Sequence, residues 1–172
     1  MSRSGLELVV FIGLQGAGKT TRYRCCFAGT HEHISKDAWP NARHRQRRQL
    51  RLIDHALGAG RSVVVDNTNP APEDRLPLVA AARTHDALAP AVWFPASVGE
   101  CLARTRRRQG RARVPEVAIL STARRLRPPS IQEGFYRVQI ARMTAARTFE
   151  LEESATAADP WPVGGRLWHL DQ

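Results

Sequence analysis

Short apolar runs alternate with segments of helical periodicity along most of this chain. The run Leu6–Ile12 is mostly apolar, which is typical of a strand buried on both faces of a parallel sheet. Three further runs predict strands at residues 31–35, 62–66 and 87–94. Residues 136–143 alternate between polar and apolar side chains, which predicts a last strand.

Helical patterns separate these strands. Leu50, Ile53 and Leu57 recur at helical spacing, and Gly58 provides an end for their helix. The expected helices cover about 19–27, 39–57, 73–84 and 97–108. This alternation predicts an α/β fold with a parallel sheet, helices on both faces and right-handed crossovers. Ligands in such folds bind beyond the carboxyl ends of the strands, so the residues after each strand are the candidates for a functional site.

Composition predicts an ordinary globular protein. With 172 residues, 42% of them apolar and 24% charged, we expect one domain with its own core. No apolar run approaches the roughly 20 residues that span a bilayer, and the first residues lack a convincing cleavage site. The three cysteines, Cys25, Cys26 and Cys101, have no zinc-ligand or redox spacing. These observations predict a cytoplasmic protein without a membrane partner.

The net charge of +10 has two interpretations. Only Lys19 and Lys36 among the 26 basic residues are lysines, and a GC-rich coding bias would produce the same excess of arginine. A positive field nevertheless raises association rates and affinity for polyphosphates, whatever its origin. The charge alone therefore leaves a polyanionic partner and an ordinary solvated surface equally open.

The segment after the first strand carries a specific motif. Gly13–Thr20 reads "GLQGAGKT" and fits G-x-x-x-x-G-K-[ST] between a predicted strand and a predicted helix, which specifies a P-loop NTPase-type sheet flanked by helices. Its glycines allow close approach of the backbone to phosphate, and the helix N-terminus offers N–H donors. Lys19 is expected to reach the β- and γ-phosphates, and Thr20 to ligate Mg²⁺. The expected ATP ligands in this loop are Gly13, Gly16, Ala17, Gly18, Lys19, Thr20 and Thr21.

Two acidic residues follow later strands. Asp37 comes after "HEHIS", where its carboxylate would face the terminal phosphate and take a proton from an attacking hydroxyl. The alternative role for Asp37 is an N-cap of the helix expected to begin near Trp39. Asp66 ends the strand "SVVVD", as a Walker B type acid does, and would hold Mg²⁺ through water.

Two more groups of polar residues have both a functional and a structural interpretation. Asn67, Thr68 and Asn69 place hydrogen-bonding groups beyond the same strand, or else form a turn in which Asn69 caps a helix starting at Pro70. Arg104 and Arg108 are four residues apart on an expected helix, hence on one face. Two guanidinium groups there would clamp a transferring phosphoryl group, or form a solvated arginine face.

These segments, in this order, resemble the polynucleotide 5′-hydroxyl kinase family, whose members include the kinase module of polynucleotide kinase 3′-phosphatase and the phage polynucleotide kinase. The resemblance covers roughly Leu8 to Ile140 and rests most on "DNTNP" after a strand and on the closing "P-x-x-x-EGF". It implies transfer of the γ-phosphate of ATP to the 5′-OH end of DNA or RNA in nucleic-acid repair, with any ligase or phosphatase on a separate protein.

The resemblance also implies domain limits and residue roles. It predicts one adenylate-kinase-like domain over residues 1–172, with a helical lid at about 97–127 and a tail at about 145–172 without a recognisable motif. Lys19, Asp37 and Arg108 would be catalytic, with Asp37 as general base. The remaining implied contacts are Arg104 and Arg108 on the donor phosphates, and Lys36, Asp66, Asn67, Thr68 and Asn69 on the acceptor side.

Two features depart from the family pattern. Relatives commonly have Asn-Arg-Asp where this chain has Ser35-Lys36-Asp37, so Lys36 offers a point charge instead of a bidentate fork. Pro40 occupies the position of the phage enzyme's acceptor-binding arginine. The candidates to replace that arginine are Arg43, Arg45, Arg47 and Arg48. Trp161 and Trp168 in the tail are interpreted as packing residues.

Two other functions remain open from the sequence. Related P-loop folds phosphorylate a nucleoside, sugar or antibiotic hydroxyl with the same machinery, so a small-molecule kinase is the first alternative. A nucleotide-binding regulatory ATPase that transfers nothing is the second, and it would have no use for Asp37 as a base.

Overall fold

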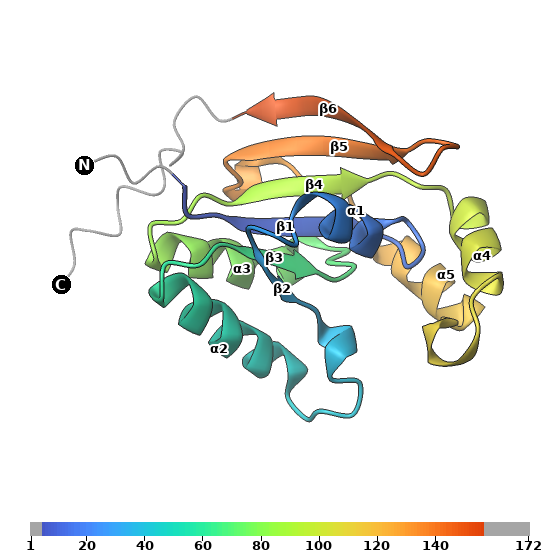
Figure 1. The fold of residues 1–172 in the computed structure, drawn as a ribbon, viewed down its shortest axis with the longest axis horizontal. Helices are drawn as coiled ribbons and strands as arrows, with labels where there is room; N and C mark the ends of the chain where they lie inside the picture. Colours follow the sequence, from blue (N-terminus) through green and yellow to red (C-terminus); the bar gives the residue numbers. More distant parts are fainter. Residues whose placement is uncertain (1–4, 157–172) are drawn as a thin grey trace.

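Strand β1 (Leu8–Gly13) is the centre of the sheet. All of its residues are buried, because apolar side chains on both of its faces pack against other elements. Val10 and Ile12 join the core on one side of the sheet, and Val9 and Phe11 join the core on the other. The computed structural model describes residues 5–156 of the chain and arranges them as in Figure 1.

Six strands form one sheet, in the order β2-β3-β1-β4-β5-β6. The strands next to or beyond β1 are β2 (Glu32–Ile34), β3 (Val63–Asp66), β4 (Pro90–Phe94), β5 (Arg137–Met143) and β6 (Phe149–Thr156). Pairing is parallel from β2 through β5, and β6 runs antiparallel to β5. Register pairs Phe11 with Asp66 and Ile34 with Val65, so the carboxyl ends of β1, β2 and β3 meet at one edge.

Helices cover both faces of the sheet (Figure 1). They are α1 (Lys19–Cys26), α2 (Arg45–Gly58), α3 (Pro72–Thr84), α4 (Val98–Arg106) and α5 (Glu116–Arg125), with single 3₁₀ turns η1 (Lys36–Ala38), η2 (Gly110–Ala112) and η3 (Ile131–Glu133). Ile53 of α2 and Leu78 of α3 pack on the core that contains Val10, whereas Cys101 of α4 and Ile119 of α5 pack on the core that contains Phe11. The predicted α/β P-loop-type sheet is therefore confirmed.

Two sequence predictions about elements were wrong. The helix expected over 39–57 begins at Arg45, because Trp39 before Pro40 is non-helical (φ −133°, ψ 61°) and His44, directly before α2, has a left-handed backbone (φ 55°, ψ 44°). Residues 136–143 do form β5, but β5 is not the last strand. The chain turns after it and returns as β6, within the region predicted to be a tail without a motif. Trp161 and Trp168 lie outside the described residues.

None of the helices within residues 5–156 combines the length and the apolar character that a membrane span requires.

Candidate active site

The loop between β1 and α1 has the backbone shape of a phosphate cradle. Gly16 and Gly18 have φ values of 83° and 99°, in the left-handed region, and Gly18 directly precedes α1. A Cβ on Gly16 would lie 2.9 Å from the carbonyl oxygen of Cys101 in α4, so a larger residue would displace the lid helix. The first N–H groups of α1 lack intrahelical partners and are the donors that a helix N-terminus offers to phosphate.

Lys19 is the first residue of α1 and is buried, with 8% of its surface exposed. Its Nζ donates to the carbonyl oxygens of Gly13 (2.9 Å) and Leu14 (2.7 Å), so the side chain folds back along the loop. Burial lowers the pKa of Lys19 to about 8; the charges of Asp66 and Asp37 oppose this shift, and that of Arg108 adds to it. The ammonium group thus lies within electrostatic reach of both candidate acids and of a lid arginine.

Asp66 sits beside this loop because β3 pairs with β1 in parallel register. The Thr20 hydroxyl donates to Asp66 Oδ2 at 2.6 Å, and His33 Nε2 lies 2.9 Å from the same oxygen. The His33 ring stacks on Tyr23 of α1, with ring centroids 4.1 Å apart. These contacts hold the carboxylate, which is 4% exposed, in one orientation. Sequence reasoning missed His33, although its position on the strand beside Asp66 follows once the strand order is known.

Thr20 and Asp66 fit a magnesium site of the kind that nucleotide phosphates complete. A hydroxyl and a carboxylate are hard oxygen ligands, and their oxygens are 2.6 Å apart. Mg²⁺ in such sites keeps several waters and binds one or two protein oxygens together with substrate phosphates. Among residues 5–156, no cluster of three or more His, Cys, Asp or Glu side chains could hold a metal ion.

Asp37 lies in the 3₁₀ turn η1, directly beyond β2. Ser35 caps this turn by accepting a hydrogen bond from the Asp37 N–H at 3.3 Å. The alternative role of Asp37 as an N-cap is wrong, because α2 begins at Arg45 with His44 as its N-cap. The residue is exposed and lines the same cavity as Lys19. Its carboxylate is therefore open to an acceptor group that enters this cavity.

The residues after β3 form hydrogen bonds that hold the loops around the cavity in place. Asn67 Oδ1 accepts from the Lys36 N–H at 2.8 Å, and its Nδ2 donates to the buried Gln49 Oε1 at 2.6 Å, which ties η1 to α2. Asn69 Nδ2 donates to the Phe11 carbonyl at 2.8 Å and holds this loop against β1. Asn67 thereby fixes the turn that carries the candidate base.

The loop that follows β3 forms part of the cavity wall. Asn67, Thr68 and Asn69 all line the cavity, as expected for acceptor-side residues. Asn69 as a helix cap was wrong, because α3 begins at Pro72 and its N-cap is Ala71, whose N–H donates to Asp74 at 3.1 Å.

The two lid arginines have different positions. Arg104 is on α4, and its guanidinium donates to the Gly16 carbonyl at 3.2 Å, so it braces the phosphate loop. The prediction that Arg108 shares its helical face was wrong, because α4 ends at Arg106 and the Arg108 N–H closes a turn on Thr105 at 3.0 Å. Arg108 instead lines the cavity, where Arg104 is not among the lining residues.

A cavity of about 370 Å³ brings these groups together. Residues of its wall that sequence reasoning missed are Gln15, Asp74, Thr122 and Arg125. Arg125 pairs with Asp74 at 2.9 Å, and the Gln15 amide donates to Thr122 at 3.1 Å. Thr122 and Arg125 belong to α5, which the sequence analysis did not separate from the rest of the lid, although Ile119 and Ala123 have helical spacing after Pro115. Of the four arginines considered for the acceptor side, Arg45 lines this cavity.

Solved structures share this fold at low sequence identity. A sugar kinase from Janibacter sp. HTCC2649 is 18% identical, with 80% of this chain and 86% of that chain covered at a TM-score of 0.61. Chaetomium thermophilum Kti12, in complex with ADP-AlF3, is 16% identical, with 81% and 92% covered at a TM-score of 0.63. A fungal RNA kinase is 17% identical, with 82% of this chain but only 39% of that chain covered at a TM-score of 0.58.

These likenesses establish a P-loop, kinase-like fold. The model of the family described as "AAA domain" matches residues 8–129, which include the phosphate loop, Asp37, Asp66 and the helices α4 and α5. The chain belongs to this AAA domain family.

Proposed function

We propose that this protein is an ATP-dependent kinase that phosphorylates the 5′-hydroxyl end of a polynucleotide. The observation that carries the proposal is the shared cavity of Lys19 and Asp37, which extends to the cations Lys36, Arg45 and Arg125. A donor site, a base and a basic wall therefore adjoin one another.

The phosphate loop would form the side of the cavity that binds ATP, the phosphate donor. Its backbone donors and Lys19 would hold the β- and γ-phosphates of ATP, and the Thr20 and Asp66 oxygens would hold Mg²⁺. The magnesium ion, when bound, neutralises phosphate charge. Arg104 keeps the loop in shape through the Gly16 carbonyl, and Arg108 lies where its guanidinium can meet the transferring group.

Asp37 would mark the side of the cavity that receives the acceptor hydroxyl. Its carboxylate would take the proton of the 5′-hydroxyl while the hydroxyl oxygen forms a bond to the γ-phosphorus. The bond between the γ-phosphorus and its bridging oxygen breaks at the same time, and ADP leaves. Asn67 supports this step by holding η1, through Lys36 N–H, at a fixed place beside α2.

The charges on the acceptor wall favour an acidic acceptor. Burial lowers the pKa of Lys36, with Arg45 adding to the shift and Asp74 opposing it, so Lys36 and Arg45 act on each other. Arg125 is held toward the cavity by Asp74. Arg125 is thus already paired, but a neutral sugar or nucleoside has no group that would offset the charges of Lys36 and Arg45, whereas the phosphodiesters of a polynucleotide do.

Asp37→Asn tests the proposal most directly. We expect transfer of label from γ-labelled ATP to a 5′-OH oligonucleotide in the wild type, and a loss of at least about a hundredfold in the variant, because general-base catalysis contributes about 10²–10⁴-fold. Binding of an ATP analogue, measured by calorimetry, should change by less than about twofold, since Asp37 is on the acceptor side.

One control variant and three contrary outcomes make the test specific. Lys19→Ala should lose both nucleotide binding and transfer, which separates donor from acceptor defects. Full transfer by Asp37→Asn would refute the role of the base. Transfer to sugars or nucleosides but to no oligonucleotide would replace the proposal by a small-molecule kinase, and ATP hydrolysis without any acceptor would replace it by a regulatory ATPase.

A further inference from the structure

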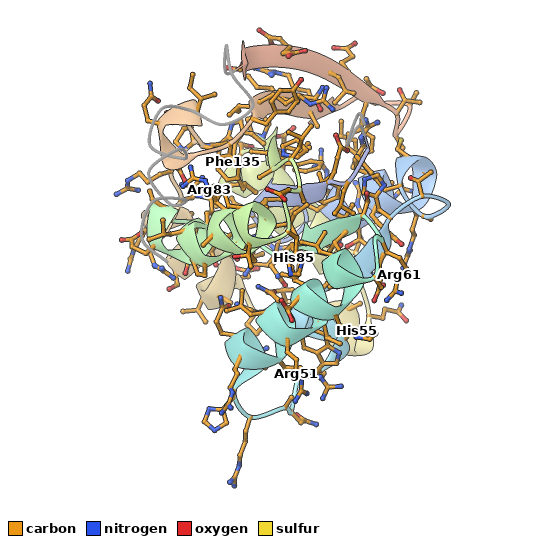
Figure 2. The ribbon with its side chains drawn as sticks, turned by 90° about the vertical axis from the view of Figure 1, so that its left-hand side faces the viewer. Arg51, His55, Arg61, Arg83, His85 and Phe135 are labelled. Carbon is orange, nitrogen blue, oxygen red and sulfur yellow. The ribbon has the colours of Figure 1, made fainter. Side chains whose placement is uncertain are left out.

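The first half of α2 and the residues just before it carry a dense run of exposed arginines. Five of the nine residues from Arg43 to Arg51 are arginine, and no acidic residue follows before Asp54. These five, Arg43, Arg45, Arg47, Arg48 and Arg51, are all exposed, and we call them the α2 arginine surface. The helix attaches to the sheet through other positions, mainly Ile53, Ala56 and Leu57. Figure 2 shows α2 with Arg51 and His55 along it.

The five arginines of the α2 arginine surface have no acidic partner among the described residues. Seven other arginines in the described part of the chain pair with acids, in the pairs Arg61–Glu32, Arg75–Glu133, Arg104–Glu100, Arg106–Glu116, Arg125–Asp74, Arg137–Glu7 and Arg142–Glu152, whereas Arg24, Arg107 and Arg124 have no described acid within ion-pair distance. No described acidic residue pairs with any of the five. Arg48 lies over the ring of Trp39, 5.0 Å from its centroid, which leaves its charge uncompensated.

Unpaired like charges on neighbouring turns of a helix repel one another and destabilise it. Arg47 and Arg51 are separated by four residues, so they lie one above the other, about 5–6 Å apart at Cβ. These arginines repel one another, and no acid of the described chain compensates their charge. An external polyanion would compensate it, and its binding would be favoured by the release of counterions.

The surface is continuous with the cavity. Arg45, in the first turn of α2, lines the cavity that holds Asp37 and Lys36. Arg48 neighbours Arg45 at i+3 and Arg51 neighbours Arg48 at i+3, so these side chains form a row along the helix. Arg47 adjoins this row through Arg51 at i+4. A strand whose 5′ end reaches Asp37 would therefore leave the cavity past Arg45 and meet the other arginines.

We propose that the α2 arginine surface binds the phosphodiester backbone of the acceptor strand on the 3′ side of its first nucleotide. This inference rests on the proposed function and adds a binding track to it. Three or more phosphates beyond the first would contact the surface without any base being read, because guanidinium groups bind phosphate oxygens irrespective of sequence.

The test compares phosphorylation of 5′-OH oligonucleotides of different lengths. For the wild-type protein at saturating ATP, kcat/KM should rise at least about tenfold from a dinucleotide to a 12-mer at low salt, as successive phosphates engage the surface. In Arg47→Gln/Arg51→Gln, the ratio of the two kcat/KM values should fall toward one. Fluorescence anisotropy of a labelled 12-mer should show the slope of log affinity against log salt becoming smaller by about one to two.

A charge-matched control uses Arg61→Gln/Arg142→Gln. These exposed arginines pair with Glu32 and Glu152 and do not line the cavity, so the same loss of two charges should leave the length ratio within about twofold of the wild type. Circular dichroism of both double variants checks that each is folded.

The results separate the inference from the function on which it rests. Transfer that is independent of length, or a length ratio that both double variants lower equally, would overturn the α2 surface and leave the kinase intact. The absence of transfer to every oligonucleotide, including the dinucleotide, would overturn the proposed function and the surface together.

Discussion

Lys19 combines two requirements that conflict in the nucleotide-free protein. Its position at the start of α1 places Nζ among the phosphate-binding groups, and the same position buries it. Burial disfavours the ammonium form, which is why the pKa of Lys19 is lowered to about 8. The carbonyls of Gly13 and Leu14 accept hydrogen bonds from Nζ and keep it in place before a nucleotide arrives.

This pKa predicts how nucleotide affinity depends on pH. Bound phosphates favour the ammonium form, so the complex holds more protons than the free protein once the pH exceeds about 8. Affinity for ADP should be constant from pH 6.5 to 7.5 and fall as pH rises through 8, by at least about fivefold at pH 9.5. Calorimetry in two buffers of different ionisation enthalpy should reveal proton uptake at pH 8.5.

Lys36→Gln provides the matched control, because it removes the only other lysine and leaves the donor side intact. The pH dependence should persist in this variant. An affinity for ADP that stays flat between pH 7 and 9.5 would show that Lys19 is not the group responsible.

The segment "PPSIQEGF", which supported the family resemblance, has a structural use in this chain. Glu133 in η3 accepts from the Ser130 N–H at 3.0 Å and lies 3.0 Å from Nε of Arg75, a fully buried residue of α3. Burial lowers the pKa of Arg75 and raises that of Glu133, and the opposite charge of the partner resists both shifts. The buried Phe135 follows and packs in the core beside β5. These contacts attach the start of β5 to α3, and Phe135 is labelled in Figure 2.

Arg75→Met should therefore destabilise the fold markedly. Removing one partner leaves the other charge poorly solvated, which costs about 3 kcal/mol. Urea denaturation followed by circular dichroism measures this loss. Arg75→Met combined with Glu133→Gln should lose less than the sum of the single variants, because no uncompensated charge remains.

An exposed ion pair supplies the comparison for this experiment. Arg61→Gln breaks the pair with Glu32, whose side chains are 49% and 38% exposed, and should cost less than about 1 kcal/mol. Equal losses for Arg75→Met and Arg61→Gln would show that the joint between α3 and η3 is not important for stability.

The whole fold and the nucleotide site are linked because β1, α1 and β3 build both. The residues of β1 are the centre of two cores, and its last residue opens the phosphate loop. Arg104 also joins the lid to this loop. Binding at the loop should therefore stabilise the chain against global unfolding.

Nucleotide should raise the melting temperature by an amount set by mass action. ADP with Mg²⁺ at a hundred times its Kd should add about 2.7 kcal/mol and raise Tm by about 5–10 °C. Differential scanning calorimetry measures this shift, and it should be absent in Lys19→Ala at the same concentration of ADP. A wild-type Tm that ADP does not change would rule out binding at the phosphate loop.

The local structure of the segment Gly13–Thr20 was predicted correctly. The strand–loop–helix at Gly13–Thr20 follows from a buried apolar run, glycines at positive φ and a helix start, which are properties of neighbouring residues. The start of α2 and strand β6 were missed, because the hydrophobic pattern cannot show where a proline interrupts a helix or which strand pairs with an exposed edge.

The sequence by itself determined the phosphate loop, the α/β class and the identity of Asp37 as an acid beyond a strand. Tertiary structure decided what each of these faces. Only the strand order β2-β3-β1-β4 brings His33 to Asp66 and Asp37 into the cavity of Lys19, and only the packing of α5 brings Arg125 to the same cavity. The physical reason is that backbone conformation and the periodic burial of side chains depend on residues that are adjacent in the sequence. Pairing between distant strands depends instead on long-range contacts, which a local sequence pattern does not show.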